Sequence, residues 1–198
     1  MSEVVMSTEQ GYEQLAAGRF EEAIETFSLS LLEELVDAKA LRGRGLAYVQ
    51  LKQWPLAIAD FDGARKLAPE QIDNWVDLGM SLAMDHQVYP AIEVFETLLT
   101  KHPECVRAHI ELGLLHLRIG AIPKGVSQLQ RGLERRPTLT ERRFIESVLR
   151  QQEQLDQKRY YRPDFEALNR KRRRGNSSNW IERLLSLLRR ARKSSSKT

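Results

Sequence analysis

The stretch from residue 75 to residue 103 reads WVDLGMSLAMDHQVYPAIEVFETLLTKHP, and its pattern decides the fold. Apolar residues recur every three or four positions within each half of it, at Leu78, Leu82, Ile92, Phe95 and Leu99. That spacing places them on one face of an α-helix. We therefore predict two antiparallel helices, the second of which ends before Pro103, because proline cannot continue a helix.

The pattern recurs at a constant spacing as far as residue 139, and we call this spacing the repeat interval. Small residues of the first helix follow it at Gly11, Gly45, Gly79 and Gly113. In the second helix, small residues follow it at Ala23, Ala57, Ala91 and Gly125, and large apolar ones at Phe27, Phe61, Phe95 and Leu129. Small residues let two helix backbones approach closely. We therefore predict four stacked hairpins that share one core, with the large residues filling the space beside each crossing.

The quoted stretch resembles the tetratricopeptide repeat through Trp75-x2-Leu78-Gly79-x2-Leu82, Ala91-x3-Phe95 and Pro103. Repeats of that family are about 34 residues long, which agrees with the spacing of Gly45 and Gly79. This resemblance implies an all-α fold, a right-handed superhelical solenoid of helix hairpins with a concave groove that receives an extended peptide or a helix. The first and fourth units depart from the aromatic positions of the pattern, as terminal repeats usually do. The replacements are Ser7, Gln14, His109 and His116.

A capping helix is predicted after the fourth unit. Thr138-x2-Glu141 has the spacing of a capping box, in which each residue caps the other's backbone N–H. An apolar stripe follows and is expected to cover the last hairpin, at Phe144, Ile145, Val148 and Leu149. The repeats and this helix are predicted to span residues 1–157.

The net charge divides the chain at the same place. The 198 residues hold 31 Lys and Arg against 27 Asp and Glu, a formal charge of +4. Residues 1–157 hold 17 against 24, a charge of −7, and residues 158–198 hold 14 against 3, a charge of +11. No apolar stretch reaches the ~18 residues that a membrane-spanning helix needs. A single cysteine and the lack of a signal-peptide pattern favour a cytoplasmic location.

The resemblance also implies which residues line the groove: Thr8, Tyr12, Lys39, Arg42, Leu46, Val49, Asp73, Val76, Met80, Met84, Arg107, Ile110, Leu114 and Arg118. We expect an apolar middle and a basic rim formed by Lys39, Arg42, Arg107 and Arg118. Methionines add flexible, polarizable surface of the kind found in adaptable grooves. Burial of the apolar members between hairpins is the alternative interpretation.

One well-known partner class is disfavoured. Members of the resembled family that bind chaperones hold the carboxylates of a partner's C-terminus with a Lys/Asn/Arg clamp. This chain has other residues at those positions: Thr8, Tyr12, Gly43, Asp73 and Asp77. Binding of Hsp70 or Hsp90 tails is therefore not expected.

No catalytic constellation is visible, so the sequence predicts a chain that is not an enzyme and needs no cofactor or metal. His109 and His116 lie two helical turns apart, but neither has the spacing context of a metal motif, and packing is the favoured role. Arg107 is the basic residue nearest to Cys105 in the sequence, and no motif of a catalytic cysteine surrounds it, which does not favour a reactive thiol.

A basic tail follows the repeats. Residues 158–178 read as a basic linker whose cluster is Arg170, Lys171, Arg172, Arg173 and Arg174. Residues 179–193 are predicted to form an amphipathic helix, and residues 194–198 a disordered terminus. The apolar face of the helix gathers Trp180, Ile181, Leu184, Leu185, Leu187 and Leu188, and its basic face includes Arg189, Arg190 and Lys193.

Three roles compete for this tail helix. Trp and Leu opposite Arg and Lys is the expected form of an in-plane anchor on an anionic membrane surface. The same helix could dock into a partner's groove, or into the groove of its own acidic repeats. Nucleic-acid contact through residues 170–174 ranks last, because phosphate binding does not need so large an apolar face. The sequence thus predicts an adaptor or assembly factor whose groove binds a protein segment and whose tail attaches it to a membrane or a larger complex. A nucleic-acid-associated scaffold is the alternative.

Overall fold

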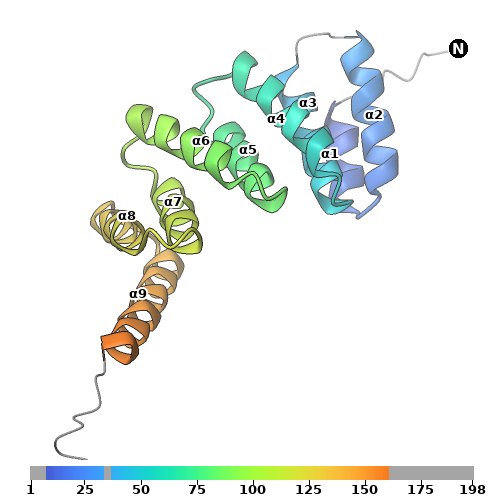
Figure 1. The fold of residues 1–198 in the computed structure, drawn as a ribbon. Coiled ribbons are helices and arrows are strands. Elements are labelled where there is room, and N and C mark those ends of the chain that lie inside the picture. Colours follow the sequence, from blue (N-terminus) through green and yellow to red (C-terminus); the bar gives the residue numbers. More distant parts are fainter. Residues whose placement is uncertain (1–7, 34–36, 161–198) are drawn as a thin grey trace, which may run out of the picture. The chain divides into compact units, whose positions relative to one another are not determined.

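The computed structural model describes residues 8–33 and 37–160, and the predictions for the linker, the tail helix and the terminus in residues 161–198 lie outside it. All regular structure in the described ranges is helical (Figure 1). The helices are α1 (Thr8–Ala16), α2 (Phe20–Glu33), α3 (Ala38–Gln50), α4 (Trp54–Leu67), α5 (Ile72–Met84), α6 (Val88–Lys101), α7 (Val106–Arg118), α8 (Ile122–Glu134) and α9 (Leu139–Tyr160). The predicted all-α solenoid of helix hairpins is confirmed for this part of the chain.

The chain divides into two compact units after Arg150, and α9 runs across the division. The first unit holds the repeats and the start of α9, up to Arg150. Of the second unit, the described residues include only 151–160, the end of α9. This helix continues beyond position 157, where the change in charge suggested a boundary, and ends at Tyr160.

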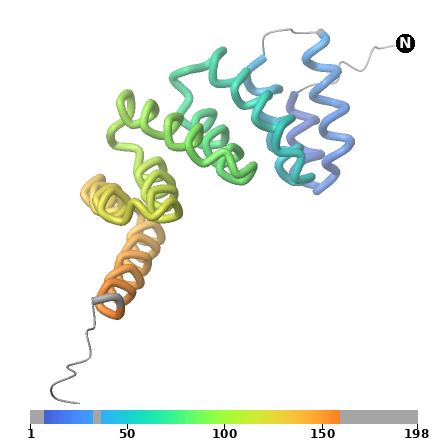
Figure 2. Tube along the Cα trace, viewed as in Figure 1, coloured from blue at the N-terminus to red at the C-terminus, as the bar shows by residue number. Residues whose placement is uncertain are grey.

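In the first unit, each hairpin packs on the next one in the sequence. Four hairpins are formed by the helix pairs α1/α2, α3/α4, α5/α6 and α7/α8. Neighbouring hairpins contact each other through the pairs α2/α3, α4/α5 and α6/α7. The trace in Figure 2 accordingly passes from one hairpin to the next in chain order. Such a stack gains its stability from nearest-neighbour interfaces, because a lone hairpin leaves an apolar face uncovered.

The core recurs at the repeat interval, as predicted. Phe27, Phe61, Phe95 and Leu129 are fully buried. Each lies against the repeat glycine of its own hairpin, where the glycine has no side chain to displace it. Burying a Phe or Leu side chain fully stabilises a fold by about 1.5–3 kcal/mol, so this set supplies a large share of the core. The large residue lies directly over the glycine, and not only beside the crossing as the sequence suggested.

The turn inside each hairpin also repeats. Its central residue has a positive φ in all four hairpins: 75° at Gly18, 57° at Lys52, 63° at His86 and 79° at Gly120. These positions are separated by the repeat interval. The backbone bonds match as well, since Gln53 N donates to Tyr48 O at 2.9 Å and Ala121 N donates to His116 O at 2.8 Å. Lys52 and His86 therefore occupy a conformation that glycine adopts at the two other turns.

Helix α9 closes the repeat stack as predicted, with one correction. Glu141 Oε2 accepts from Thr138 N at 2.8 Å, and Glu141 N donates to Thr138 Oγ1 at 3.3 Å, which is the expected capping box. Ile145 is fully buried beside Leu129, and Val148 and Leu149 pack on the same cluster. Phe144 was expected in that stripe, but 44% of it is exposed, because it lies one position to the side of Ile145 on the helix.

Candidate functional site

A hollow of about 210 Å³ lies among α3, α4 and α5, with Arg107 reaching it from α7. Its lining brings together five residues predicted for the groove, namely Leu46, Val49, Met80, Met84 and Arg107. The other lining residues are Trp54, Phe61, Asp77 and Ser81. The surface of this hollow is mostly apolar, and its charged members are Asp77 and Arg107.

The geometry of the helices explains why these residues meet. Met80 and Met84 are four positions apart on α5, and Leu46 and Val49 are three apart on α3, so each pair lies on one helix face. Met80 is half-buried, and 57% of Met84 is exposed. Unbranched thioether side chains adapt to the shape of an apolar ligand, which suits an exposed binding surface.

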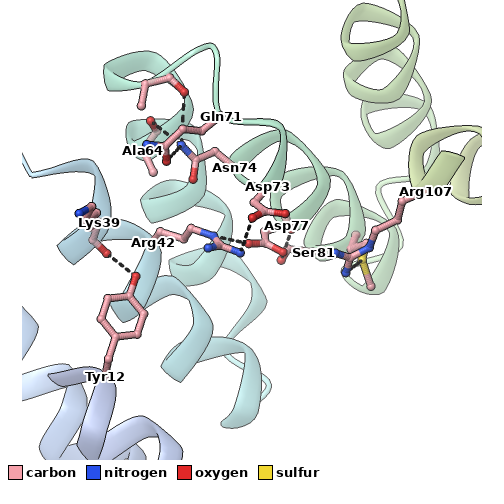
Figure 3. Close-up of polar contacts among 12 residues, drawn as sticks. Tyr12, Lys39, Arg42, Ala64, Gln71, Asp73, Asn74, Asp77, Ser81 and Arg107 are labelled. Atoms are coloured by element: carbon pink, nitrogen blue, oxygen red, sulfur yellow. Dashed lines mark hydrogen bonds and ion pairs between the residues drawn. The ribbon is translucent and has the colours of Figure 1, made fainter. Parts of the chain in front are cut away.

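An ion pair at this site joins α3 of the second repeat to α5 of the third. Arg42 Nε donates to Asp77 Oδ2 at 2.8 Å, and Arg42 Nη2 lies 3.6 Å from Asp73 Oδ2. Figure 3 shows Arg42 extending from its helix toward both carboxylates. Asp77 is largely buried whereas Asp73 is exposed. Burial raises the pKa of Asp77 despite the hydrogen bond from Arg42, because desolvation of the carboxylate outweighs the pairing.

This pairing corrects the predicted basic rim. Arg42 was expected to offer positive charge to a ligand, but Asp77 and Asp73 already compensate it. Arg118 is held against the end of α5, where its Nη1 donates to Ala83 O at 3.1 Å. Lys39 and Arg107 are exposed. The rim is therefore of mixed charge and not uniformly basic.

Arg107 is directed at the hollow. Its Nη2 lies 3.4 Å from Met80 Sδ, across the gap between α7 and α5, and Figure 3 shows the guanidinium against that sulfur. A guanidinium next to an apolar surface can pair with a carboxylate of a ligand whose apolar part fills the hollow. The site thus offers one apolar recess and one accessible cation.

The remaining predicted groove residues have other surroundings. Val76 and Ile110 are only 1% and 7% exposed, so they form core, as the alternative interpretation held, and offer no surface to a partner. Leu114 is half-buried in the cluster under α9. Tyr12 packs edge-on against Phe27 at 5.2 Å, and its hydroxyl donates to Lys39 O at 2.9 Å. Burial raises the pKa of this tyrosine.

The two histidines of the fourth hairpin pack inside the fold. His109 Nδ1 lies 2.9 Å from Gln128 Oε1, and its Nε2 lies 3.1 Å from Pro103 O. His116 is also buried, and burial lowers its pKa. Among residues 8–33 and 37–160, no three His, Cys, Asp or Glu side chains are grouped so that they could hold a metal ion. Burial raises the pKa of the Cys105 thiol.

Sequence reasoning missed the part of the site that α4 contributes. Trp54 and Phe61 of α4 also line the hollow, although the resemblance assigned the groove to the first helix of each unit. Phe61 could have been found, because its ring lies at the crossing of α4 with Gly45 of α3.

No described helix is both long enough and apolar enough to cross a membrane.

Comparisons with known proteins agree with this architecture. A Candida albicans protein described as a peroxisomal targeting signal receptor is 28% identical over 105 residues, which make up 53% of this chain and 18% of that protein. The chain therefore spans less than a fifth of that relative. Among solved structures, a crystal structure of MamA has a TM-score of 0.61 at 23% identity, covering 64% of this chain and 74% of that one.

A second solved structure is the second TPR domain of human RPAP3 in complex with the HSP70 peptide SGPTIEEVD. Its TM-score is 0.53 at 22% identity, covering 56% of this chain and 93% of that one. The sequence profile described as tetratricopeptide repeat matches residues 8–72 and 91–139, more than half of the chain. The chain belongs to the tetratricopeptide repeat family, whose fold is a scaffold for protein–protein interaction.

Proposed function

We propose that this protein is an adaptor that binds a segment of another protein in the hollow between α3 and α5. The observation that carries the proposal is the recess of about 210 Å³ formed by Leu46, Val49, Met80 and Met84, with Arg107 beside it. An apolar side chain of the partner would fill the recess. A carboxylate nearby would pair with Arg107, whose guanidinium already points at Met80.

The comparisons support a peptide as the ligand class. The similar RPAP3 domain was solved with a peptide bound, so the same fold can hold a peptide segment. Its peptide ends in an acidic sequence, whereas this site carries Asp73 and Asp77 next to Arg42. Two carboxylates share one Arg42 here, so this side of the site keeps a negative charge. An internal segment with an apolar anchor and one carboxylate for Arg107 therefore fits better than a chain end that carries several carboxylates.

A peptide selection tests this proposal. A random peptide library would be displayed and selected against the full chain, and the recovered peptides would be measured by fluorescence anisotropy. Met84→Glu places a charge at the mouth of the recess and should weaken binding by about tenfold or more. Tyr89→Glu is the matched control, because Tyr89 is 73% exposed and lies outside the recess.

Both substitutions replace exposed side chains, so neither should unfold the protein. The proposal is wrong if the selection enriches no peptide. It is also wrong if the Met84→Glu and Tyr89→Glu proteins bind the selected peptides equally well.

The tail would supply the second half of the adaptor. Its charge of +11 in residues 158–198 and the apolar face centred on Leu184 and Leu188 are properties of the sequence. We propose that it attaches the repeats to an anionic membrane surface, where each basic residue contributes about 1 kcal/mol. A flotation experiment with vesicles would distinguish membrane attachment from the two alternatives, which are docking into a protein groove and nucleic-acid contact.

A further inference from the structure

In the third hairpin the indole of Trp75 lies in a buried space, which we call the aromatic slot. Trp75 is 3% exposed, and its Nε1 donates to Pro69 O at 2.8 Å. Two cations lie over the indole, with Arg65 Cζ at 4.7 Å and Lys101 Nζ at 5.0 Å from the ring centroid. The slot therefore combines apolar walls, one carbonyl acceptor and flanking positive charge.

The fourth hairpin has the same slot with a smaller ring in it. His109 follows Trp75 by one repeat interval, and its Nε2 lies 3.1 Å from Pro103 O, which repeats the contact of the indole with Pro69 O. Imidazole is smaller than indole. A hollow of about 300 Å³ lies at this position, among α6, α7 and α8.

The walls of this hollow correspond to the surroundings of Trp75. Three of its lining residues follow residues around Trp75 by one repeat interval: Leu112 follows Leu78, Pro103 follows Pro69 and Arg135 follows Lys101. Arg135 is exposed at the mouth of the hollow, as is Arg131. The hollow thus keeps apolar walls and one cation at the sequence position of Lys101, whereas Leu99 stands where the third hairpin has Arg65.

Contacts at both of its nitrogens hold the imidazole: a neutral ring that donates from Nε2 to Pro103 O accepts at Nδ1 from the side-chain amide of Gln128, whose oxygen and nitrogen exchange places when the amide flips. His109 Nδ1 lies 2.9 Å from Gln128 Oε1, and Gln128 stands where the third hairpin has Val94. His109 is 4% exposed and forms the floor of the hollow. The polar pair His109 and Gln128 therefore replaces the apolar pair Trp75 and Val94, and the contact between its two side chains fixes His109.

We propose that this hollow is a second binding site, which takes a tryptophan side chain of a partner protein flanked by acidic residues. The indole would stack under Arg135, as Trp75 does under Lys101. Arg131 and Arg135 against the single carboxylate of Glu96 give the mouth an excess of positive charge, which favours acidic flanks. The same charge disfavours Trp180 of this chain, because that residue lies in a strongly basic tail.

This site is separate from the recess proposed for the groove. The recess between α3 and α5 and the hollow at His109 share no lining residue. Arg107 of the recess and His109 of the hollow are two positions apart on α7, and that spacing points them to different sides of the helix. A variant of one site can therefore serve as the control for the other.

The probe is a synthetic peptide, acetyl-Asp-Glu-Trp-Glu-Asp-amide, with 5-fluorotryptophan as its Trp. Binding to the full chain would be followed by ¹⁹F NMR, which sees the probe alone. We expect a saturable shift at millimolar concentrations. His109→Trp should abolish it, because the protein's own indole would then occupy the slot, as Trp75 occupies the corresponding slot of the third hairpin.

Two further variants make the result independent of any effect on folding. Arg135→Glu changes an exposed side chain and should weaken probe binding by about tenfold, through loss of the cation over the ring and repulsion of the acidic flanks. Met84→Glu alters the other recess and should leave probe binding unchanged. A probe with Lys at each acidic position should bind more weakly than the acidic probe.

The proposal is overturned by any of three results: no saturable shift with the wild-type chain, equal binding to the wild-type and His109→Trp proteins, or tighter binding of the Lys probe.

Discussion

The ring of Phe95 in α6 lies directly over Gly79 in α5, so that a Cβ on this glycine would be 2.6 Å from Phe95 Cζ. The closest approach is 2.6 Å for Gly11 with Phe27, 2.7 Å for Gly45 with Phe61 and 2.8 Å for Gly113 with Leu129. Real Cβ atoms do not come this close to another heavy atom. Each hairpin therefore depends on a glycine in its first helix and a large residue in its second.

Gly79→Ala should destabilise the protein by about 1–3 kcal/mol, because the buried Phe95 ring must shift within a packed core. The measurement is the free energy of unfolding from urea titration. Gly132→Ala is the matched control, since its Cβ would lie 3.4 Å from the nearest atoms, an ordinary contact. Gly132 lies in the last turn of α8, where that substitution should be neutral or stabilise by less than about 1 kcal/mol. Equal effects of the two substitutions would refute the packing argument.

Lys52→Gly should stabilise the protein by about 0.5–1 kcal/mol. Lys52 has a φ of 57°, a conformation that costs a residue with a side chain about 1–2 kcal/mol, part of which the greater freedom of glycine in the unfolded chain offsets. Gly120→Ala introduces the same strain at φ 79° and should destabilise by about 1 kcal/mol. Thermal or urea unfolding of both variants checks the pair, and a Lys52→Gly protein less stable than the wild type would contradict the argument.

The fold was predictable because its decisive residues recur. Gly79 and Phe95 each belong to a set of residues spaced by the repeat interval. Two consecutive stretches that each place their apolar residues on one helical face are enough to predict a hairpin. The turn at Lys52 was harder to predict, since lysine carries no signal for a positive φ. Its place in the same series as Gly18 and Gly120 was the available clue.

The candidate site was predictable only in part. Met84 and Val76 of α5 were both predicted to line the groove, but Met84 is exposed in the structure whereas Val76 is buried. The partner of Arg42 depends on which side chain of α5 comes closest, and that follows from the stacking of hairpins. Periodicity therefore gives helix faces, but ion pairs and hollows require the packed structure.

Asp77→Asn should become more stable relative to the wild type as the pH rises. Burial raises the pKa of Asp77 above its ordinary value of 3.8, so the wild-type fold loses stability as the pH passes from about 4 through the raised value. The asparagine variant does not titrate and lacks this loss, while Arg42 keeps an oxygen to donate to. Urea unfolding at about pH 3.5 and about pH 7 measures the difference.

Asp62→Asn is the control, because the sign is reversed there. Burial acts to raise the pKa of Asp62, but hydrogen bonds from Lys66 and Arg65 lower it overall. The wild-type fold therefore gains stability from Asp62 as the pH rises through the lowered pKa to the ordinary one, and the asparagine variant lacks that gain. A pH dependence of the same sign in both variants would rule out the assignment for Asp77.

The full chain should float with vesicles that contain anionic lipid, and a Leu184→Glu, Leu188→Glu double variant should remain in the soluble fraction. The reason is that two charges on the apolar face would prevent its insertion between headgroups. Sucrose-gradient flotation gives the bound fraction. If both proteins stay in the soluble fraction, membrane attachment is wrong, and flotation of both to the same extent would assign the attachment to charge alone.

The central claim, that a protein segment binds between α3 and α5, is tested most directly by hydrogen exchange of the full chain with a selected peptide. The account predicts slower amide exchange around Leu46 and Val49 in α3 and around Met80 and Met84 in α5, with no change in α9. Slower exchange confined to α7 and α8 around His109, or no change at a saturating peptide concentration, would contradict it.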